Sequence, residues 1–118
     1  MEIDIGTTSS GSSCSAHWHD RASHGFKGRG VAEATEVGGV WWVNRVIVQP
    51  ENLRGRGIGS RLVEALKQKV KELGGSRLIV CPGGYHDDVE SQRRFYERCG
   101  FTRSSTDQDL WECDLEDS

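Results

Sequence analysis

The sequence predicts an α/β (α+β) fold, in which a mixed β-sheet is built around one central βαβ unit. Three consecutive features predict that unit: an apolar, β-rich run over residues 40–48, a strongly periodic helical pattern that begins near residue 58, and a second apolar run over residues 77–81. Strands connected through a helix in this way are parallel neighbours, because the crossover returns the chain to the same end of the sheet. We therefore expect the two apolar runs to lie side by side.

The N-terminal part divides into a weakly patterned segment and a hairpin. Residues 1–6 alternate and predict a short strand, whereas residues 7–30 are rich in Ser, Gly and His without a helical stripe, which predicts a loop. The β-rich runs over residues 31–37 and 40–48 are separated by two glycines, a typical hairpin signal. An antiparallel pair is therefore expected to lead into the βαβ unit.

The predicted helix has one apolar stripe, formed by Ile58, Leu62, Leu66, Val70 and Leu73. This period predicts an amphipathic helix whose stripe is buried and whose charged residues, Lys67 among them, lie elsewhere on its surface. Two glycines then end the helix. The short run over residues 77–81 is nearly all apolar, as in a strand inside a sheet. Pro82 lacks an N–H donor, so strand pairing should fail there.

A second helix and a closing pair of strands are predicted for the C-terminal part. Asp87 followed three residues later by Glu90 is a capping-box pattern, and Gly100 marks a typical helix end. Residues 101–105 and 110–115 are expected to form two short strands around a turn.

Length and composition indicate a single domain over residues 1–118, with a poorly defined N-terminal segment at 1–30. The net charge of −3 gives no electrostatic case for nucleic acid as a partner. No apolar run approaches the roughly 20 residues that a membrane span needs, and the start of the chain is not followed by the apolar region of a signal peptide. We therefore expect a cytoplasmic protein with no membrane partner.

Metal binding is not predicted, although one segment gathers residue types that ligate metals. Cys14, His17, His19, Asp20 and His24 lie close together in the sequence, but their spacing matches no familiar zinc motif. The four cysteines form no C-x-x-C pair, and in a cytoplasmic chain we expect free thiols. A solvated loop is expected for this segment.

The sequence RGRGIG over residues 54–59, between the predicted strand and helix, is the strongest functional signal. Glycines let backbone N–H groups approach a ligand closely. A helix start adds unpaired N–H donors and the positive end of the helix dipole, which suits a phosphate or pyrophosphate. Two better-known phosphate loops are excluded, because Gly59 is followed by Ser60 and Arg61 rather than by a P-loop lysine, and the glycine spacing does not fit the dinucleotide fingerprint.

Two motifs in this order resemble the GNAT family of N-acetyltransferases. Arg54, Gly57 and Gly59 match the family's pyrophosphate loop, Arg/Gln-x-x-Gly-x-Gly/Ala, and the sequence FYERCGF over residues 95–101 matches its second motif. The resemblance implies a sheet whose parallel strands splay apart, with acetyl-CoA as co-substrate and no metal. It also implies direct transfer of an acetyl group to a primary amine within a ternary complex, with a small molecule or a protein as acceptor.

The resemblance also assigns residues to the coenzyme and to catalysis. Backbone groups of the strand and the loop would hold the coenzyme, at a site formed by Val46, Ile47, Val48, Arg54, Gly55, Arg56, Gly57, Ile58, Gly59 and Ser60. Tyr96 stands where the family commonly carries the acid that protonates the leaving thiolate, and an ordinary tyrosine pKa of about 10 keeps it protonated at pH 7. The strand before the loop has no carboxylate, so Glu33, Glu36, His86 and water remain open as the base.

The chain departs from the family in its N-terminal part. GNAT domains usually place two helices between their first two strands, where this chain has about two dozen Ser- and His-rich residues. The acceptor site is thus expected to be open, to be completed by a second subunit in a homodimer, or to be absent. The last case would leave the alternative function, a non-catalytic acyl-CoA-binding or nucleic-acid-binding domain. Trp41 and Trp42 point to opposite faces of one strand, so one is expected in the core and the other at the acceptor site.

Overall fold

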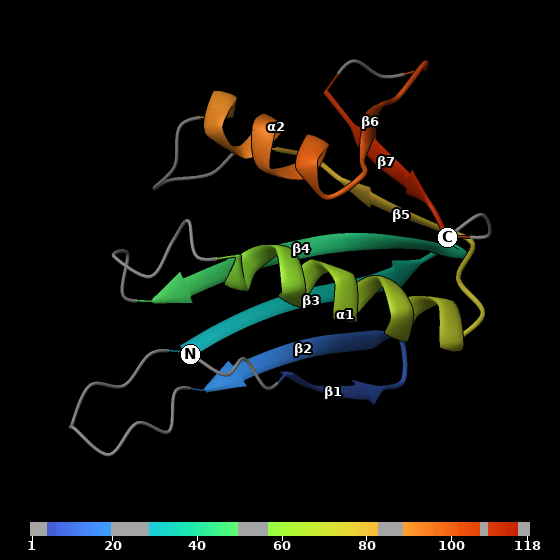
Figure 1. Ribbon diagram of the computed structural model, residues 1–118. Helices are drawn as coiled ribbons and strands as arrows, with labels where there is room; N and C mark the ends of the chain where they lie inside the picture. The colour runs from blue at the N-terminus through green and yellow to red at the C-terminus, as the bar shows by residue number, and fades with distance from the viewer. Residues whose placement is uncertain (1–4, 20–28, 50–56, 83–88, 107–108, 116–118) are drawn as a thin grey trace.

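The computed structural model describes residues 5–19, 29–49, 57–82, 89–106 and 109–115, which form one seven-stranded mixed sheet and two helices (Figure 1). The elements in chain order are β1 (Ile5–Ser10), β2 (Ser13–His19), β3 (Arg29–Val37), β4 (Val40–Gln49), α1 (Ile58–Glu72), β5 (Arg77–Val80), α2 (Val89–Arg98), β6 (Thr102–Arg103) and β7 (Trp111–Asp114). The strand order is β1-β2-β3-β4-β5-β7-β6. The predicted α/β (α+β) class is confirmed.

Strand pairing at the centre of the sheet agrees with the sequence. β4 and β5 are parallel neighbours connected through α1, and the remaining described pairs are antiparallel. The β3–β4 hairpin turns at Gly38 and Gly39, whose φ angles of 61° and 84° are the positive values that a type I′ turn requires at both central positions. The predicted closing pair is also present, as β6 and β7.

The prediction of a loop over residues 7–30 is wrong for its first half. β1 and β2 form a hairpin that turns at Gly11 and Ser12, so the first two strands of the sheet follow each other directly. In β2, the buried Cys14, Ala16 and Trp18 alternate with serines and a histidine. This two-residue period is a strand signal, but the high serine content favoured a loop. The predicted abbreviation of the N-terminal part is confirmed.

α1 lies across β1, β2, β3 and β4 on one face of the sheet (Figure 1). We call this covered face the inner face and the opposite one the outer face. The core between α1 and the inner face contains four of the predicted stripe residues of the helix, namely Ile58, Leu62, Leu66 and Val70. Leu73 was expected in the stripe but is 41% exposed, because the helix ends at Glu72 and Gly74, at φ 91°, reverses the chain.

A β-bulge in β4 opens the sheet between β4 and β5. Glu33 of β3 pairs with Arg45, but the next residue, Ala34, pairs with Val43, so Asn44 is an extra residue in β4. A bulge bends its strand and increases the local twist. The pairing of β4 with β5 ends just before it, at Trp42 and Ile79, while β4 continues to Gln49. The predicted splay of the parallel pair therefore has a local cause in the chain.

The second helix begins at Val89 and ends at Arg98, as its end signal predicts. Asp87, the predicted capping residue, lies outside the described residues. Pairing of β5 ends at Val80, before Pro82, as expected. Neither described helix is long and apolar enough to cross a membrane.

Candidate functional site

The N-terminus of α1 presents backbone donors without a side-chain cap. Gly57 is the N-cap residue at φ 82°, and no side chain caps the helix there. The first intrahelical bond runs from the N–H of Arg61 to the carbonyl of Gly57, at 3.1 Å. The N–H groups of the three residues between them therefore have no partner within the helix. The first turn contains no acidic side chain, so no side chain of that turn neutralises the positive end of the helix dipole.

The two glycines of the predicted loop that the structure describes have different roles. A Cβ on Gly57 would meet no atom within 4 Å, so this glycine is required by its positive φ alone. A Cβ on Gly59 would lie 3.1 Å from Cε1 of Phe95 in α2. Gly59 therefore lets α2 approach the first turn of α1, a packing role that the motif alone did not predict. Arg54, Gly55 and Arg56 lie outside the described residues.

The end of β4 lies beside this helix start, since a Cβ on Gly59 would lie 3.9 Å from Val48, and one edge of the strand pairs with no strand among the described residues. Val46 and Ile47 are partly buried and Val48 is buried. None of these residues pairs with β5, because that pairing ends at Trp42. Beyond the bulge, β4 therefore offers an extended backbone edge of the kind to which another extended chain can bind as a strand would. Strand edge and helix start together form the described part of the predicted coenzyme site.

The side chain of Tyr96, a residue of α2, is buried in the hydrophobic core of the protein. Only 6% of the residue is exposed, and its ring packs edge-on against Phe95 and Phe101, with centroids 5.1 Å and 5.4 Å away. Burial, and to a lesser extent the charge of Cys99, raises the pKa of Tyr96 to about 12. The hydroxyl therefore keeps its proton at pH 7. The structure places this predicted acid next to Phe95, the residue that contacts Gly59.

Ser60 and Lys67 of α1 also contact α2. Burial raises the pKa of the Cys99 thiol, and the side chain of Ser60, which lies near it, has the smaller effect of lowering that pKa. Lys67 was expected on the helix surface but is only 8% exposed. Its ammonium donates to the carbonyl oxygen of Cys99.

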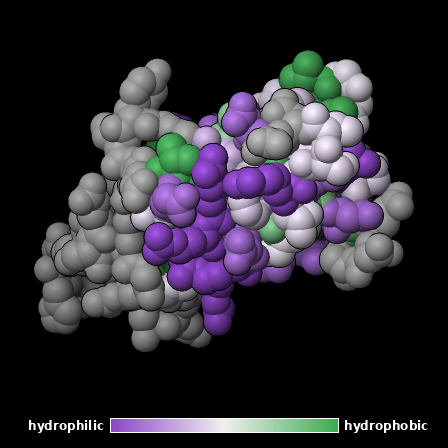
Figure 2. All heavy atoms as spheres, turned by 90° about the horizontal axis from the view of Figure 1, so that it is seen from above, coloured by the Kyte–Doolittle hydropathy of each residue, from purple (hydrophilic) through white to green (hydrophobic). Residues whose placement is uncertain are grey.

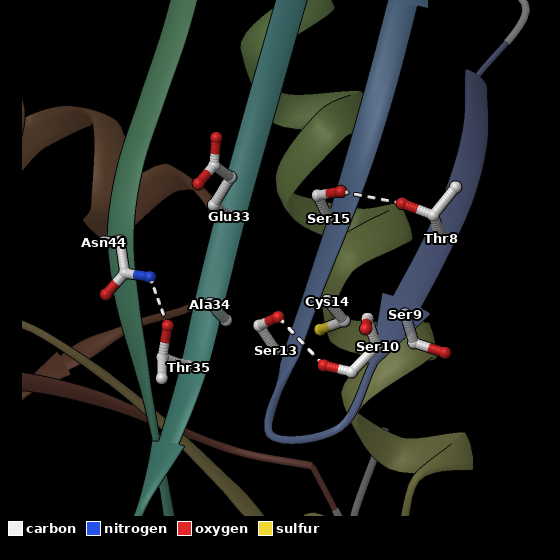
Figure 3. Close-up of a pocket in the computed structure, with 10 residues that line it drawn as sticks. All are labelled: Thr8, Ser9, Ser10, Ser13, Cys14, Ser15, Glu33, Ala34, Thr35 and Asn44. Atoms are coloured by element: carbon white, nitrogen blue, oxygen red, sulfur yellow. Dashed lines mark hydrogen bonds between the residues drawn. The ribbon is translucent and has the colours of Figure 1, made fainter.

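The outer face carries a polar depression of about 350 Å³ that spans β1 to β4 (Figure 3). Eight of its lining residues have hydroxyl, amide or carboxylate side chains, namely Thr8, Ser9, Ser10, Ser13, Ser15, Glu33, Thr35 and Asn44. Some of these are joined to one another, since the hydroxyl oxygens of Ser15 and Thr8 are 2.9 Å apart. Arg45 donates to Oε1 of Glu33 from Nε at 2.9 Å and from Nη2 at 2.6 Å.

Several residues whose roles the sequence left open lie on different faces of the sheet. Trp41 is buried and Trp42 is partly exposed, so the expected core position of one tryptophan is confirmed, whereas the expected place of the other at the acceptor site stays a prediction. Glu36 is exposed near the end of the β3–β4 hairpin, whereas His86 lies outside the described residues. Cys14 is buried on the inner face, while the side chain of His17 lies 2.7 Å from the Ser15 hydroxyl on the outer face. These two cannot share a metal ion.

The exposed surface of α2 is strongly charged. Figure 2 looks onto the end of the molecule that carries α2, and hydrophilic side chains dominate the described surface in this view. Glu90, Arg94, Glu97 and Arg98 are exposed on this helix. Arg93 is partly buried, with Nη1 lying 3.6 Å from Oε1 of Glu90, so its charge is partly neutralised within the helix.

Comparison with known proteins gives one family. The family model described as an acetyltransferase (GNAT) domain matches residues 16–103. No curated protein sequence matches the chain significantly.

Solved structures with the same fold include three of interest. A protein from Desulfovibrio desulfuricans assigned to the GNAT acetyltransferases is 18% identical, with a TM-score of 0.68 over 88% of this chain and 70% of that one. A PaiA N-acetyltransferase from Thermoplasma acidophilum, in complex with coenzyme A, is 17% identical, with a TM-score of 0.61 over 86% and 59%. An anti-CRISPR protein is 19% identical, with a TM-score of 0.59 over 81% of this chain and 96% of its own.

Proposed function

The chain belongs to the GNAT acetyltransferase family, and on this basis we propose that it transfers an acetyl group from acetyl-CoA directly to a primary amine in a ternary complex. The observation that carries the proposal is the uncapped start of α1 beside the unpaired edge of β4. The helix start would bind the pyrophosphate through the N–H groups of Ile58, Gly59 and Ser60. The loop residues Arg54, Gly55, Arg56 and Gly57 would complete this site.

The pantetheine arm would bind along the open edge of β4. Backbone groups of Val46, Ile47 and Val48 would pair with its two amide groups, as another strand would. The thioester would then lie in the gap between β4 and β5, close to the bulge at Asn44. An N–H of the same strand would donate to the oxyanion that forms during transfer.

The transfer itself needs two proton movements. The neutral amine nitrogen attacks the thioester carbonyl carbon, the carbonyl oxygen becomes an oxyanion, and the C–S bond breaks as the carbonyl re-forms. Tyr96 protonates the departing thiolate, and the attacking nitrogen loses its extra proton to a base, from which Tyr96 is reprotonated through solvent. On the outer face, Glu33 is the candidate base among the described residues, and water is the other candidate.

The burial of Tyr96 limits when it can release its proton. Its pKa of about 12 exceeds that of an ordinary thiol, about 8.5, so complete transfer to a free thiolate would cost roughly 5 kcal/mol. The hydroxyl is therefore suited to donate a hydrogen bond while charge develops on sulfur. Proton transfer is completed only as the amine proton is lost.

The acceptor would approach from the outer face, because α1 and α2 occupy the inner one. The depression next to Asn44 offers hydroxyl groups, an amide and the carboxylate of Glu33. These groups suit a hydrophilic amine, which either a small molecule or the lysine of a protein can present. The β1–β2 hairpin replaces the two helices that usually help to form this side of the family's site.

The proposal is tested by coenzyme binding and by turnover with the same protein. Coenzyme A should raise the melting temperature, and acetyl-CoA with a panel of small amines and lysine-rich proteins should release free coenzyme A. Gly57→Val should abolish binding, since φ 82° disfavours a β-branched residue. Gly39→Val is the matched control, because Gly39 has φ 84° and open space around its Cβ at the distant hairpin. Binding without turnover on any amine would favour the non-catalytic acyl-CoA-binding alternative, and binding of nucleic acid alone would contradict the proposal.

A further inference from the structure

Lys67 is a buried cation that connects the middle of α1 to the end of α2. Burial of an ammonium is costly unless it is paired or hydrogen-bonded. Here the ammonium donates to the carbonyl oxygen of Cys99 and lies 5.4 Å from the centroid of the Phe101 ring. Glu64, at 3.8 Å, is its exposed ion-pair partner. The carbonyl of Cys99 belongs to the C-terminal turn of α2, where the helix dipole favours a positive charge.

The residue after Cys99 leaves room for this cation. Gly100 has φ 92°, and a Cβ there would lie 3.3 Å from Nζ of Lys67. The glycine therefore ends the helix and also leaves space for the ammonium that donates to the carbonyl oxygen of Cys99.

The C-terminal turn of α2 fixes both the backbone and the ring of Tyr96. The carbonyl of Tyr96 accepts bonds from the N–H of Cys99 at 3.1 Å and of Phe101 at 3.0 Å. The Phe101 ring, which faces the ammonium of Lys67, packs edge-on against the Tyr96 ring. Lys67 thus contacts two groups that fix the backbone and the ring of Tyr96.

The first turn of α1 contacts the same segment of α2. Gly59 lies against Phe95, the residue before Tyr96, and the side chain of Ser60 lies near that of Cys99. The helix start that offers donors to a phosphate is therefore in direct contact with the turn that carries the tyrosine.

We propose that Lys67 is a positioning residue for Tyr96, which it holds buried and oriented by anchoring the C-terminal turn of α2 to the helix that begins at the coenzyme loop. Its catalytic consequence rests on the proposed function, but its structural consequence does not. Binding of the coenzyme at the first turn of α1 would act on the placement of Tyr96 through these contacts.

The first test measures Tyr96 directly and needs no substrate. The chain has two tyrosines, so Tyr85→Phe leaves Tyr96 as the one phenol, and its titration is followed by NMR of ¹³C-labelled tyrosine. Lys67→Met should lower the Tyr96 pKa from about 12 toward the ordinary value of about 10, because the ring becomes more exposed. Loss of a positive charge alone would raise this pKa, so an unchanged or higher value would overturn the proposal. Lys71→Met, which removes an exposed charge from the same helix, should leave it unchanged.

The second test is a double-mutant cycle on turnover. Lys67→Met should lower kcat by roughly 10- to 100-fold, less than the full contribution of about 10²–10⁴-fold that a general acid makes, while the Kd for coenzyme A stays within about threefold. In a Tyr96→Phe background the same substitution should cause no further loss, because its effect passes through the hydroxyl. Equal losses in both backgrounds would overturn the proposal. If Lys67→Met does not fold, the cycle is run with Lys67→Gln, which removes the charge but keeps a polar group at this position and should show the same non-additivity. A wild-type protein without turnover would contradict the proposed function, whereas the titration would still decide the role of Lys67.

Discussion

Gly59→Ala should destabilise the protein because it overpacks the contact between α1 and α2. The new Cβ would lie 3.1 Å and 3.3 Å from two ring atoms of Phe95, so the ring or the helix must move by a few tenths of an ångström. Overpacking of this kind costs about 1–3 kcal/mol, and the better helix propensity of alanine offsets up to about 1 kcal/mol. We expect a net loss of roughly 1–2 kcal/mol in the free energy of unfolding, measured by urea denaturation.

A second background identifies the cause of that loss. In a Phe95→Leu protein the ring atoms are absent, so Gly59→Ala should cost less than about 0.5 kcal/mol. Gly57→Ala should instead cost about 1–2 kcal/mol in both backgrounds, because its penalty comes from a positive φ and its Cβ meets no neighbour. An equal cost of Gly59→Ala with and without the Phe95 ring would refute the packing role of Gly59.

Three further predictions follow from the same contacts. Coenzyme A at 100 times its Kd should add about 2.7 kcal/mol to the free energy of unfolding, and no shift in melting temperature at millimolar coenzyme would contradict the site. Tyr96→Phe should lower kcat by about 10²–10⁴-fold with little change in the coenzyme Kd, and an unchanged kcat where chemistry limits the rate would exclude Tyr96 as the acid. Because the pKa of Tyr96 is raised in the folded state to about 12, its contribution to stability is complete below about pH 10 and is lost as the pH rises toward 12. That loss, roughly 2–3 kcal/mol, should be absent in Tyr96→Phe, as alkaline unfolding curves can show.

The central part of this fold was predictable because its signals are local and repeated. The stripe of α1, the two glycines of the β3–β4 hairpin and the apolar run of β5 each specify one element, and their order specifies the parallel pair. The glycine motif also located a helix start whose N-cap has a positive φ. The role of Gly59 depends on a tertiary contact, so its close approach to Phe95 could not be read from the motif.

The first hairpin was missed although a signal was present. Cys14, Ala16 and Trp18 recur with the two-residue period of a strand, but two of them are small and the intervening residues are typical of loops. The sequence of β1 has an even weaker strand signal, because most of its residues are exposed and it has no apolar face.

The burial of Lys67 and the bulge at Asn44 could not be predicted from the sequence, for two different reasons. Lys67 lies four residues after Val63 and three before Val70, so its position does fall on the buried side of α1. Only its partner, the end of α2, explains why a charged residue is buried there. The bulge depends on the register between β3 and β4, which no pattern within one strand specifies.

The most direct test of the coenzyme site is a titration of the ¹⁵N-labelled protein with coenzyme A, followed through the backbone amide resonances. We predict that the largest shifts occur at Ile58, Gly59 and Ser60, and along residues 46–48, because these amides would contact the pyrophosphate and the pantetheine arm. Amides of β1, at the far edge of the sheet, should not respond. Shifts confined to other surfaces, or no shifts at millimolar coenzyme, would contradict the assignment of the α1 start and the β4 edge as the acetyl-CoA site.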